Sequence, residues 1–407
     1  MPTAVPERPA REISWASFRS PEHVRAAVAL GRAGVAAAPG NPALRLVLGK
    51  ALAQAGMAEE ALDCLREAVR AFPDHEGLHQ ELAQGLARDG EVDAALACAG
   101  AREAPWAALF AFKLLVRHGR RAEAAAFEAA AAAARPADPD VLEWRAKRAR
   151  GDPPELLRLC EEALRVDPGS AQALHYQAVA LAQLGRDDEA AALMGMDRFL
   201  HAAPLAVPPG FGGGEAFLEL LREEVIANPS LRPDMPGHAT RSGLRTRTFP
   251  AAGDRAAPAL IDALRAAAGA YAKALTGDHP FVRARPDRAS LTPWALLFRS
   301  AGHQVLHHHP GCWLTGVFYV SLRREEGRAD AGQEDGPQGR RAGMLRIGAL
   351  PDWADVAPPW PVQEIVPVPG TLLLFPAFVP HETVPPGDGT ERISVAFDVT
   401  GIEGDRV

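Results

Sequence analysis

Small and apolar residues recur at helical spacing through the first half of the chain, and glycines separate the helix-like stretches at regular intervals. Each glycine follows one stretch and precedes the next, where its access to positive φ suits a tight turn. Between residues 20 and 200 these glycines recur every 29 to 34 residues, at Gly56, Gly90, Gly119, Gly151 and Gly185. The pattern predicts pairs of helices stacked into a repeat array, in which each pair contacts its neighbours.

The clearest copy of this repeat runs from residue 42 to residue 73. It places Gly49 in the first helix, Gly56 in the turn, and Ala61 and Ala68 in the second helix. Small residues at these positions allow the two helices to approach closely. With this pattern at a period near 34, the chain resembles the tetratricopeptide repeat family.

Other copies match the family less evenly. The match is strong again at 171–190 and weaker at 106–136 and 145–168, where the repeat lengths drift. A plain helical bundle is the alternative interpretation. A stacked array presents a groove that usually binds a peptide or a partner helix, so the resemblance implies a protein or peptide partner.

The helical pattern ends near residue 202, where prolines and glycines follow in close succession. Such a run breaks helices and is typical of a linker. We therefore predict a helical repeat domain at 1–204, a linker at 205–230 and a second domain at 231–407. Helical spacing also predicts a short helix at 215–226 and an amphipathic helix at 258–275.

Short runs of β-branched and aromatic residues, separated by turn residues, follow from residue 245 onward. Seven or more such strands are typical of a sandwich or jelly roll. The stretch 323–341 is rich in charged residues and glycine and lacks apolar anchors, so we predict a surface loop there. The predicted strands lie at 245–249, 294–299, 304–308, 314–322, 344–347, 364–368, 371–375 and 392–398.

Composition narrows the class of protein. With 407 residues, 47% of them hydrophobic, the chain has enough apolar material for two domains without disulfide support. Its four scattered cysteines are typical of a reducing compartment. No apolar signal segment and no run of 18 apolar residues occurs, so we expect a cytoplasmic protein with no membrane partner. The net charge of −7, without a basic stripe, disfavours nucleic acid as a partner.

Histidines provide the candidate chemistry of the second domain. His307 and His309 are two positions apart in an extended pattern, so their side chains point to one face while His308 points to the other. A third imidazole, from His381 at the end of a later strand, completes a three-nitrogen site for a divalent first-row metal.

A fixed cation follows the last of these histidines by eleven positions. Arg392 shares a strand face with the hydroxyl of Ser394, and this pair suits a dicarboxylate cosubstrate lying beside the metal. The metal site and the cation together predict a mononuclear non-haem iron enzyme.

In order and spacing, these motifs resemble the double-stranded β-helix 2-oxoglutarate/Fe(II) oxygenases, and more closely the bacterial proteins that fuse tetratricopeptide repeats to such a domain. The resemblance covers about residues 230–400. It implies an all-α tetratricopeptide-like solenoid followed by a jelly roll with flanking helices. The motifs that carry it are Ser242-Gly-Leu-Arg-Thr246, Trp294, Gly302-His303, His307-His-His-Pro-Gly-Cys-Trp313, Gly316-Val-Phe-Tyr-Val320, Pro369-Gly-Thr-Leu-Leu-Leu-Phe-Pro376, His381 and Arg392-Ile-Ser-Val-Ala-Phe-Asp398.

The resemblance also implies roles for individual residues. His307 and His381 would be the two iron histidines, and Arg392 with Ser394 would hold the distal carboxylate of 2-oxoglutarate. The protein would then be an Fe(II)- and 2-oxoglutarate-dependent dioxygenase that hydroxylates a protein or peptide recruited by the repeats, releasing succinate and carbon dioxide.

One position departs from the family pattern. The usual ligand set is His-x-Asp/Glu followed by a distant His, and here the carboxylate position holds His309. His309 is a third nitrogen ligand, or two histidines and water hold the iron with His309 nearby, or an acid such as Asp352 or Asp355 completes the set. We favour the first arrangement, because the His307-x-His309 spacing already places the ring on the metal side.

Two other functions remain open. The protein is a tetratricopeptide scaffold with a degenerate or metal-only β domain, which the missing carboxylate favours. Or it is a three-histidine dioxygenase that does not use 2-oxoglutarate, which would leave Arg392 without its expected ligand. The intact Arg392-x-Ser394 pair favours the 2-oxoglutarate enzyme, and the sequence does not identify the substrate.

Overall fold

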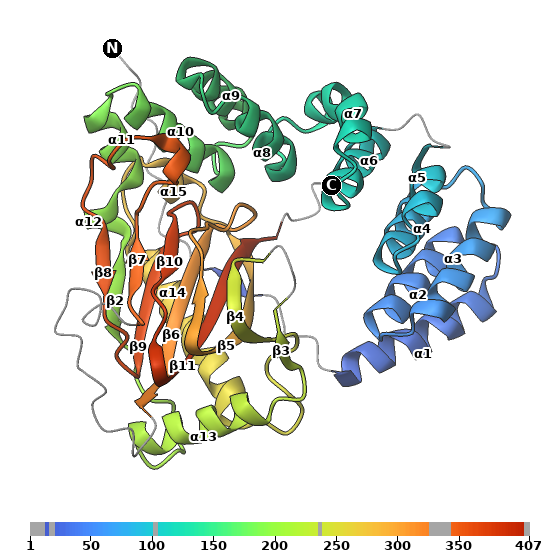
Figure 1. Ribbon diagram of the computed structural model, residues 1–407. Helices are drawn as coiled ribbons and strands as arrows, with labels where there is room; N and C mark the ends of the chain where they lie inside the picture. Colours follow the sequence, from blue (N-terminus) through green and yellow to red (C-terminus); the bar gives the residue numbers. More distant parts are fainter. Residues whose placement is uncertain (1–12, 16–20, 101–104, 235–237, 325–342, 403–407) are drawn as a thin grey trace. The chain divides into compact units, whose positions relative to one another are not determined.

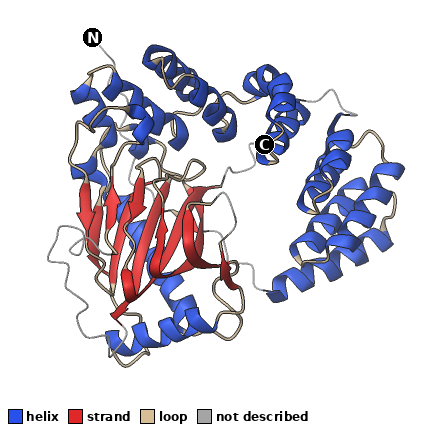
Figure 2. Cartoon of the chain, in the orientation of Figure 1, coloured by secondary structure: helices blue, strands red, loops and turns tan. Residues whose placement is uncertain are grey.

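The structure, a computed structural model, divides into two compact units, of which one is Ser17–Val141 and the other joins Met1–Ala16 to Leu142–Val407. Figure 1 traces the chain, and Figure 2 shows that the described strands all belong to the second unit. The described residues are 13–15, 21–100, 105–234, 238–324 and 343–402.

The first unit is a row of helices in which each helix from α1 to α6 packs against the next. Its last helix, α8, continues across the boundary into the second unit. The helices are α1 (Pro21–Ala37), α2 (Pro42–Gln54), α3 (Ala58–Ala71), α4 (Glu76–Arg88), α5 (Val92–Gly100), α6 (Pro105–Arg117), α7 (Arg121–Ala134) and α8 (Pro139–Arg148).

The predicted repeat at 42–73 forms the helix pair α2 and α3. Gly49 allows the pair to pack closely, because a Cβ at this position would lie 2.7 Å from the Leu65 Cδ2. Gly56 has a φ of +77° in the turn between the helices, a conformation that favours glycine. Ala68 is fully buried against the first helix and its neighbours. The small residues therefore have the packing roles that the repeat pattern predicts.

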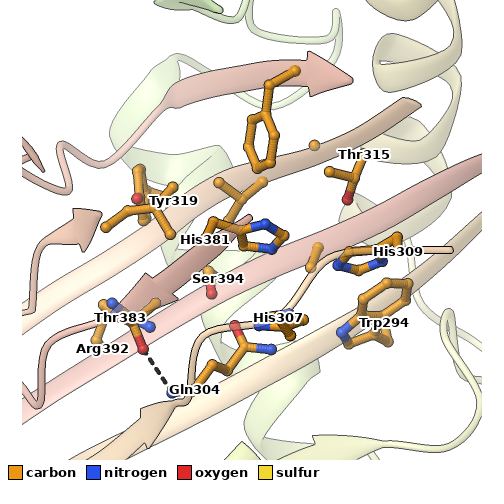
Figure 3. Close-up of a pocket in the computed structure, with 15 residues that line it drawn as sticks. Trp294, Gln304, His307, His309, Thr315, Tyr319, His381, Thr383, Arg392 and Ser394 are labelled. Atoms are coloured by element: carbon orange, nitrogen blue, oxygen red, sulfur yellow. Dashed lines mark hydrogen bonds between the residues drawn. The ribbon is translucent and has the colours of Figure 1, made fainter. Parts of the chain in front are cut away.

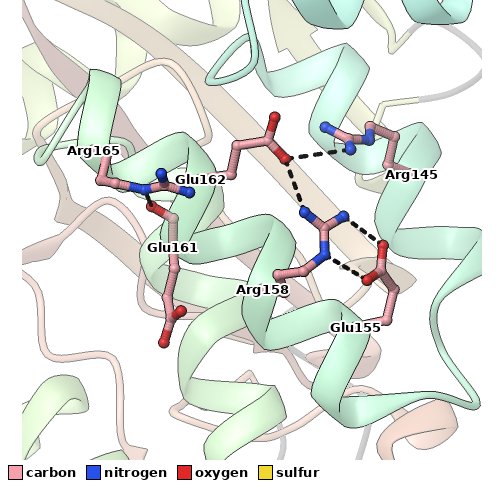
Figure 4. Close-up of polar contacts among 6 residues, drawn as sticks. All are labelled: Arg145, Glu155, Arg158, Glu161, Glu162 and Arg165. Atoms are coloured by element: carbon pink, nitrogen blue, oxygen red, sulfur yellow. Dashed lines mark hydrogen bonds and ion pairs between the residues drawn. The ribbon is translucent and has the colours of Figure 1, made fainter.

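The helices of the second unit include one, α10, that is buried on nearly all sides: eleven of its thirteen residues are buried. In contrast, α9 carries an exposed charge network in which Arg158 pairs with Glu155 and Glu162 (Figure 4). Each exposed pair of this kind contributes at most about 1 kcal/mol to stability. The helices are α9 (Pro153–Val166), α10 (Ala171–Gln183), α11 (Asp187–Met194), α12 (Met196–Phe199), α13 (Gly214–Ala227), α14 (Ala256–Ala274) and α15 (Pro280–Arg283).

Two sheets form the β part of this unit. The larger has the order β2-β9-β6-β11-β5-β4-β3, with β1 paired to β5, and the smaller has the order β10-β7-β8. Except for β1 and β5, the paired strands are antiparallel. The strands are β1 (Ser14–Trp15), β2 (His201–Pro204), β3 (Leu231–Pro233), β4 (Thr240–Thr246), β5 (Arg288–Gln304), β6 (Leu314–Arg324), β7 (Leu345–Ile347), β8 (Gln363–Ile365), β9 (Thr371–Pro376), β10 (His381–Thr383) and β11 (Gly387–Gly401).

Neighbouring strands in these sheets are mostly distant in the sequence, as β11 between β6 and β5 illustrates. Two antiparallel sheets with such crossovers are the arrangement of a jelly roll. The predicted fold class, a tetratricopeptide-like solenoid followed by a jelly roll with flanking helices, is confirmed.

Two predicted strands were placed wrongly. The separate strand at 304–308 does not form, because β5 continues to Gln304 and beyond it His307 makes an isolated bridge to His381. The strand predicted at 245–249 is β4, Thr240–Thr246. Its pairing to β5, with Thr240 opposite Gln304, decides where it begins, and the local sequence does not contain that information.

The predicted domain limits at 204 and 230 stay predictions. In the structure, β2 pairs with β9, so His201–Pro204 is part of the large sheet. The predicted linker contains α13, which covers the predicted helix at 215–226. The predicted loop at 323–341 lies outside the described residues, apart from the last two residues of β6. No helix among the described residues is long and apolar enough to cross a membrane.

Candidate active site

Three histidines meet where the end of β5 and the start of β10 lie side by side (Figure 3). The His307 N–H donates to the His381 carbonyl at 3.0 Å, and the His381 N–H donates back to the His307 carbonyl at 2.8 Å. A third backbone bond, from the His309 N–H to the Ala377 carbonyl at 2.9 Å, fixes the extended segment. The alternation predicted from the sequence is therefore kept although this segment is not a full strand.

The three imidazole rings converge on one point. One nitrogen from each of His307, His309 and His381 lies within 4.8 Å of the others, which is the spacing of a metal site. Among the described residues, this is the one group of three or more such side chains that could hold a metal ion. Asp352 and Asp355, the acids considered from the sequence, lie in and after a 3₁₀ turn at 352–354 and are not members of the cluster.

Oxygen atoms face the outer nitrogen of each ring. Nδ1 of His307 lies 2.8 Å from the Val305 carbonyl, and Nδ1 of His381 lies 3.2 Å from the Val379 carbonyl. A carbonyl only accepts, so these Nδ1 atoms carry the proton and leave the Nε2 lone pairs free. Such outer partners are typical of metal-bound histidines. The donor set therefore fits a divalent first-row metal.

Burial keeps two of the three histidines in the form that binds metals. Desolvation, together with the neighbouring His309, lowers the pKa of His307 to about 4. Desolvation also holds the pKa of His381 well below its usual value. Because only the neutral imidazole has a free lone pair, both rings are ready to coordinate at neutral pH.

A buried arginine lies in the same cavity. Arg392 is 2% exposed, and its Nη1 donates to the Gly343 carbonyl at 2.7 Å. Within the described part of the chain, its Nε and the buried hydroxyl of Tyr319 have no hydrogen-bond partner. Desolvation lowers the pKa of Arg392 and raises that of Tyr319 to about 12. Unpaired buried donors are costly, so the pocket is suited to an anionic ligand that accepts hydrogen bonds.

The cavity is small in this state, at about 20 Å³. That volume holds roughly one water molecule, so a five-carbon dicarboxylate enters only if lining groups move. One nitrogen of Arg392, Nη1, already donates to the Gly343 carbonyl. The lining residues are Trp294, Gln304, His307, His309, Thr315, Gly316, Val317, Tyr319, Leu345, Phe375, His381, Thr383, Arg392, Ser394 and Ala396 (Figure 3).

His308 points away from the cluster, toward α10. Its Nε2 lies 2.9 Å from the Gln172 side-chain oxygen, and its ring stacks on His175 at a centroid distance of 4.1 Å. Tyr176 packs edge-on against the same ring. The side chain between the two cluster histidines is therefore bound to the last buried helix of the repeat region.

We expect acid to destabilise this contact. Desolvation lowers the pKa of His175 from 6.5 to about 4, so between these values the unfolded chain binds a proton that the folded chain does not. Stability contributed by neutral His175 is therefore complete above pH 6.5 and is lost as the pH falls to 4, by up to about 3 kcal/mol. Urea unfolding at pH 7.5 and pH 4.5 measures this loss.

The matched variant for that experiment is His175→Phe, which keeps a stacking ring and removes the titrating group. Its stability should depend less steeply on pH than that of the wild type. His201→Gln, at an exposed position on β2, serves as the control. An equal pH dependence in the wild type and His175→Phe contradicts the assignment of acid sensitivity to this residue.

For Tyr319 the sequence favours core packing over a hydrogen bond to 2-oxoglutarate; in the structure this residue is buried and also lines the cavity with Arg392. Asp398 was part of a motif without a role, and its Oδ1 lies 2.7 Å from Nδ1 of His309. Alternation along the strand was the available signal for Asp398, since it continues the series of Arg392 and Ser394 by even steps.

Comparisons with known proteins agree with this geometry. Residues 292–398 match the family model described as "Putative 2OG-Fe(II) oxygenase", and residues 42–85 match a tetratricopeptide repeat model. A comparison with curated protein sequences found no match. One segment of the chain therefore matches tetratricopeptide repeats and another matches a putative 2OG-Fe(II) oxygenase domain, in agreement with the resemblance found in the sequence. Fe(II) and 2-oxoglutarate are the cofactors of such a domain, and the histidine cluster is compatible with iron.

Solved structures show distant similarity. A Pseudomonas putida prolyl-4-hydroxylase is 16% identical, with a TM-score of 0.33 over 51% of this chain and 96% of that one. A Trichoplax adhaerens prolyl hydroxylase, in complex with a hypoxia inducible factor peptide fragment, is 13% identical, with a TM-score of 0.32 over 54% and 92%. A tetratricopeptide repeat protein from Parabacteroides merdae is 17% identical, with a TM-score of 0.32 over 42% and 72%. Similarity at this level assigns neither a substrate nor a partner.

Proposed function

We propose that the protein is an Fe(II)- and 2-oxoglutarate-dependent dioxygenase that hydroxylates a protein or peptide recruited by its repeats. The observation that carries this proposal is the coincidence of two features in one buried cavity. Three metal-competent histidines lie at one end, and Arg392, a buried cation with an unpaired nitrogen, lies at the other. A ligand that bridges a metal and a cation needs anionic groups at both ends, as 2-oxoglutarate has.

In this proposal His307, His309 and His381 bind the metal, each through Nε2. Arg392 and Ser394 bind the distal carboxylate of 2-oxoglutarate. The planar guanidinium suits a carboxylate because it can donate two parallel hydrogen bonds. When bound, Fe(II) and 2-oxoglutarate supply the oxidising chemistry, in which oxygen is consumed and succinate and carbon dioxide are released.

Backbone and side-chain groups of the protein prepare the site for that reaction. Backbone carbonyls fix the orientation of two imidazoles, so little reorganisation is needed when metal binds. The apolar wall formed by Phe375 and Val317 excludes water, which strengthens the attraction between Arg392 and a carboxylate. The Tyr319 hydroxyl lies in the same cavity and is a further donor for the ligand.

The repeats supply the argument for the substrate class. A tetratricopeptide array binds peptides or helices along its surface, so a macromolecular substrate explains why this oxygenase domain carries one. The four cysteines are free in the structure, in agreement with a reducing compartment, and we place the protein in the cytoplasm.

Succinate formation tests the proposal. Purified full-length protein, supplied with Fe(II), oxygen and 2-oxoglutarate, should form succinate at a rate that increases when a lysate or peptide library provides substrate. His381→Ala should bind no stoichiometric Fe(II) and form no succinate, because losing one of three ligands removes most of the chelate. A half-buried histidine outside the cluster, His303→Ala, is the matched control and should retain both properties.

A second candidate is a three-histidine dioxygenase that does not use 2-oxoglutarate. Two observations favour it. The cavity is small, and the Gly343 carbonyl already accepts a hydrogen bond from one Arg392 nitrogen. Stoichiometric Fe(II) binding by the wild type, combined with no affinity for 2-oxoglutarate, is the outcome that this candidate predicts. A wild type that binds neither Fe(II) nor 2-oxoglutarate would favour the third candidate, a tetratricopeptide interaction scaffold.

A further inference from the structure

His309 stands where the related sites have a carboxylate, and a carboxylate nevertheless lies directly behind it. The Asp398 Oδ1 is 2.7 Å from the outer nitrogen of His309, Nδ1. The distance is that of an ion pair, and in the described part of the chain the Asp398 Oδ1 has no hydrogen-bond partner in the present ring orientation. Both side chains are largely enclosed, at 13% and 17% exposure, so the surrounding water screens this pair only weakly.

The sheet places this carboxylate with the rest of the site. Asp398 lies on β11, on the face that also carries Arg392 and Ser394, because side chains two positions apart share a face. Pairing with β5 and β6 puts it opposite Thr292 and Thr315, at the end of the sheet where the histidine segment crosses. The central strand β11 therefore carries both Arg392, the cation proposed to bind 2-oxoglutarate, and the carboxylate behind His309.

Other contacts restrict His309 from its ring face. Trp294 stacks on it with a centroid distance of 6.0 Å and an interplanar angle of 18°. The guanidinium carbon of Arg245 in turn lies 4.4 Å from the centre of the Trp294 ring. Trp294 thus limits rotation of the imidazole, and the Asp398 carboxylate faces its Nδ1.

We propose that Asp398 is a positioning residue that makes His309 a working third ligand. Its carboxylate holds the proton on Nδ1 and so turns the Nε2 lone pair toward the metal. It also supplies a negative charge behind His309, in place of the charge that an Asp or Glu bound directly to the metal would supply. A carboxylate behind a histidine ligand orients the ring and makes it a stronger donor. This inference rests on the proposed three-histidine metal set.

Metal binding, measured without turnover, tests this role. The full-length protein is titrated with Co(II), whose visible absorption reports ligand number and geometry. We expect Asp398→Ala to weaken Co(II) binding by about 10- to 100-fold, the usual effect of removing such an outer partner. Asp398→Asn should fall between the wild type and Asp398→Ala, since the amide oxygen still accepts a hydrogen bond but carries no charge.

The control removes an equal charge elsewhere. Asp355→Asn neutralises an acid outside the cluster, at a position with a φ of +53° that asparagine tolerates, and should leave Co(II) affinity unchanged. Thermal unfolding of each apoprotein separates lost binding from lost folding. If Asp398→Ala folds and binds Co(II) as tightly as the wild type, with the same spectrum, the positioning role is overturned.

A double-mutant cycle shows whether Asp398 acts through His309. If it does, adding Asp398→Ala to His309→Ala should cost little further affinity, because the ring that it positions is already gone. Additive losses would overturn the inference while leaving the histidine cluster as the metal site. Unchanged binding in His309→Ala alone would instead remove His309 from the proposed ligand set, and succinate formation would still test the oxygenase function separately.

Discussion

Arg392→Ala should weaken 2-oxoglutarate binding by on the order of a hundredfold or more while leaving Fe(II) binding nearly intact. The guanidinium is fully buried. Removing one member of a buried ion pair, here the arginine that faces the 2-oxoglutarate carboxylate, costs about 3–5 kcal/mol. The metal is spared because Arg392 is not one of the three ligands and lies six positions along β11 from Asp398, the residue beside His309. Calorimetric titration of the Fe(II)-loaded protein without oxygen measures both affinities.

Two variants sharpen this experiment. Arg392→Lys should recover part of the affinity, since the charge remains while the planar fork is lost. Arg299→Ala is the matched control, because this exposed arginine on the neighbouring strand pairs with Glu391. Equal 2-oxoglutarate affinities in the wild type and Arg392→Ala would remove the main support for this cosubstrate.

The oxygenase domain should not fold without the last helices of the repeat region. A fragment of residues 231–407 should aggregate or remain unfolded, whereas 142–407 should unfold cooperatively. The shorter fragment lacks β2, which pairs with β9, and α10, which contacts the histidine segment through His308. Circular dichroism and thermal unfolding of the two fragments measure this difference.

The size of the expected effect follows from what the shorter fragment would expose. Phe199 and Phe217, at 1% and 2% exposure, lie in the missing part, and they pack within the second unit. Burying each such side chain contributes about 1.5–3 kcal/mol, against a total stability of roughly 5–15 kcal/mol. The lost strand pairing and the lost contacts of α10 add to this deficit.

An intermediate fragment separates the contributions. Residues 205–407 retain α13 but lack β2 and α10, so they should be less stable than 142–407. A fragment of 231–407 that unfolds cooperatively at the same temperature as 142–407 would contradict this view. The predicted limit near residue 205 would then be a true boundary between independently folding parts.

The sequence by itself determined the repeat and the main chemistry of the site. Local periodicity is sufficient for both: a helical period with a glycine turn defines each repeat, as at Gly49 and Gly56. The alternation of an extended chain points His307 and His309 to one side and His308 to the other. These features depend on neighbours in the sequence, so the sequence contains them.

The tertiary structure alone decided how distant segments meet. No local pattern brings Asp398 behind His309, because that contact depends on the register of β11 against β5 and β6. The burial of His308 under α10 and the pairing of β2 with the large sheet likewise join segments far apart in sequence. Strand register and packing are fixed by the whole set of contacts that the folded chain makes at once, and a short stretch of sequence is compatible with many such sets.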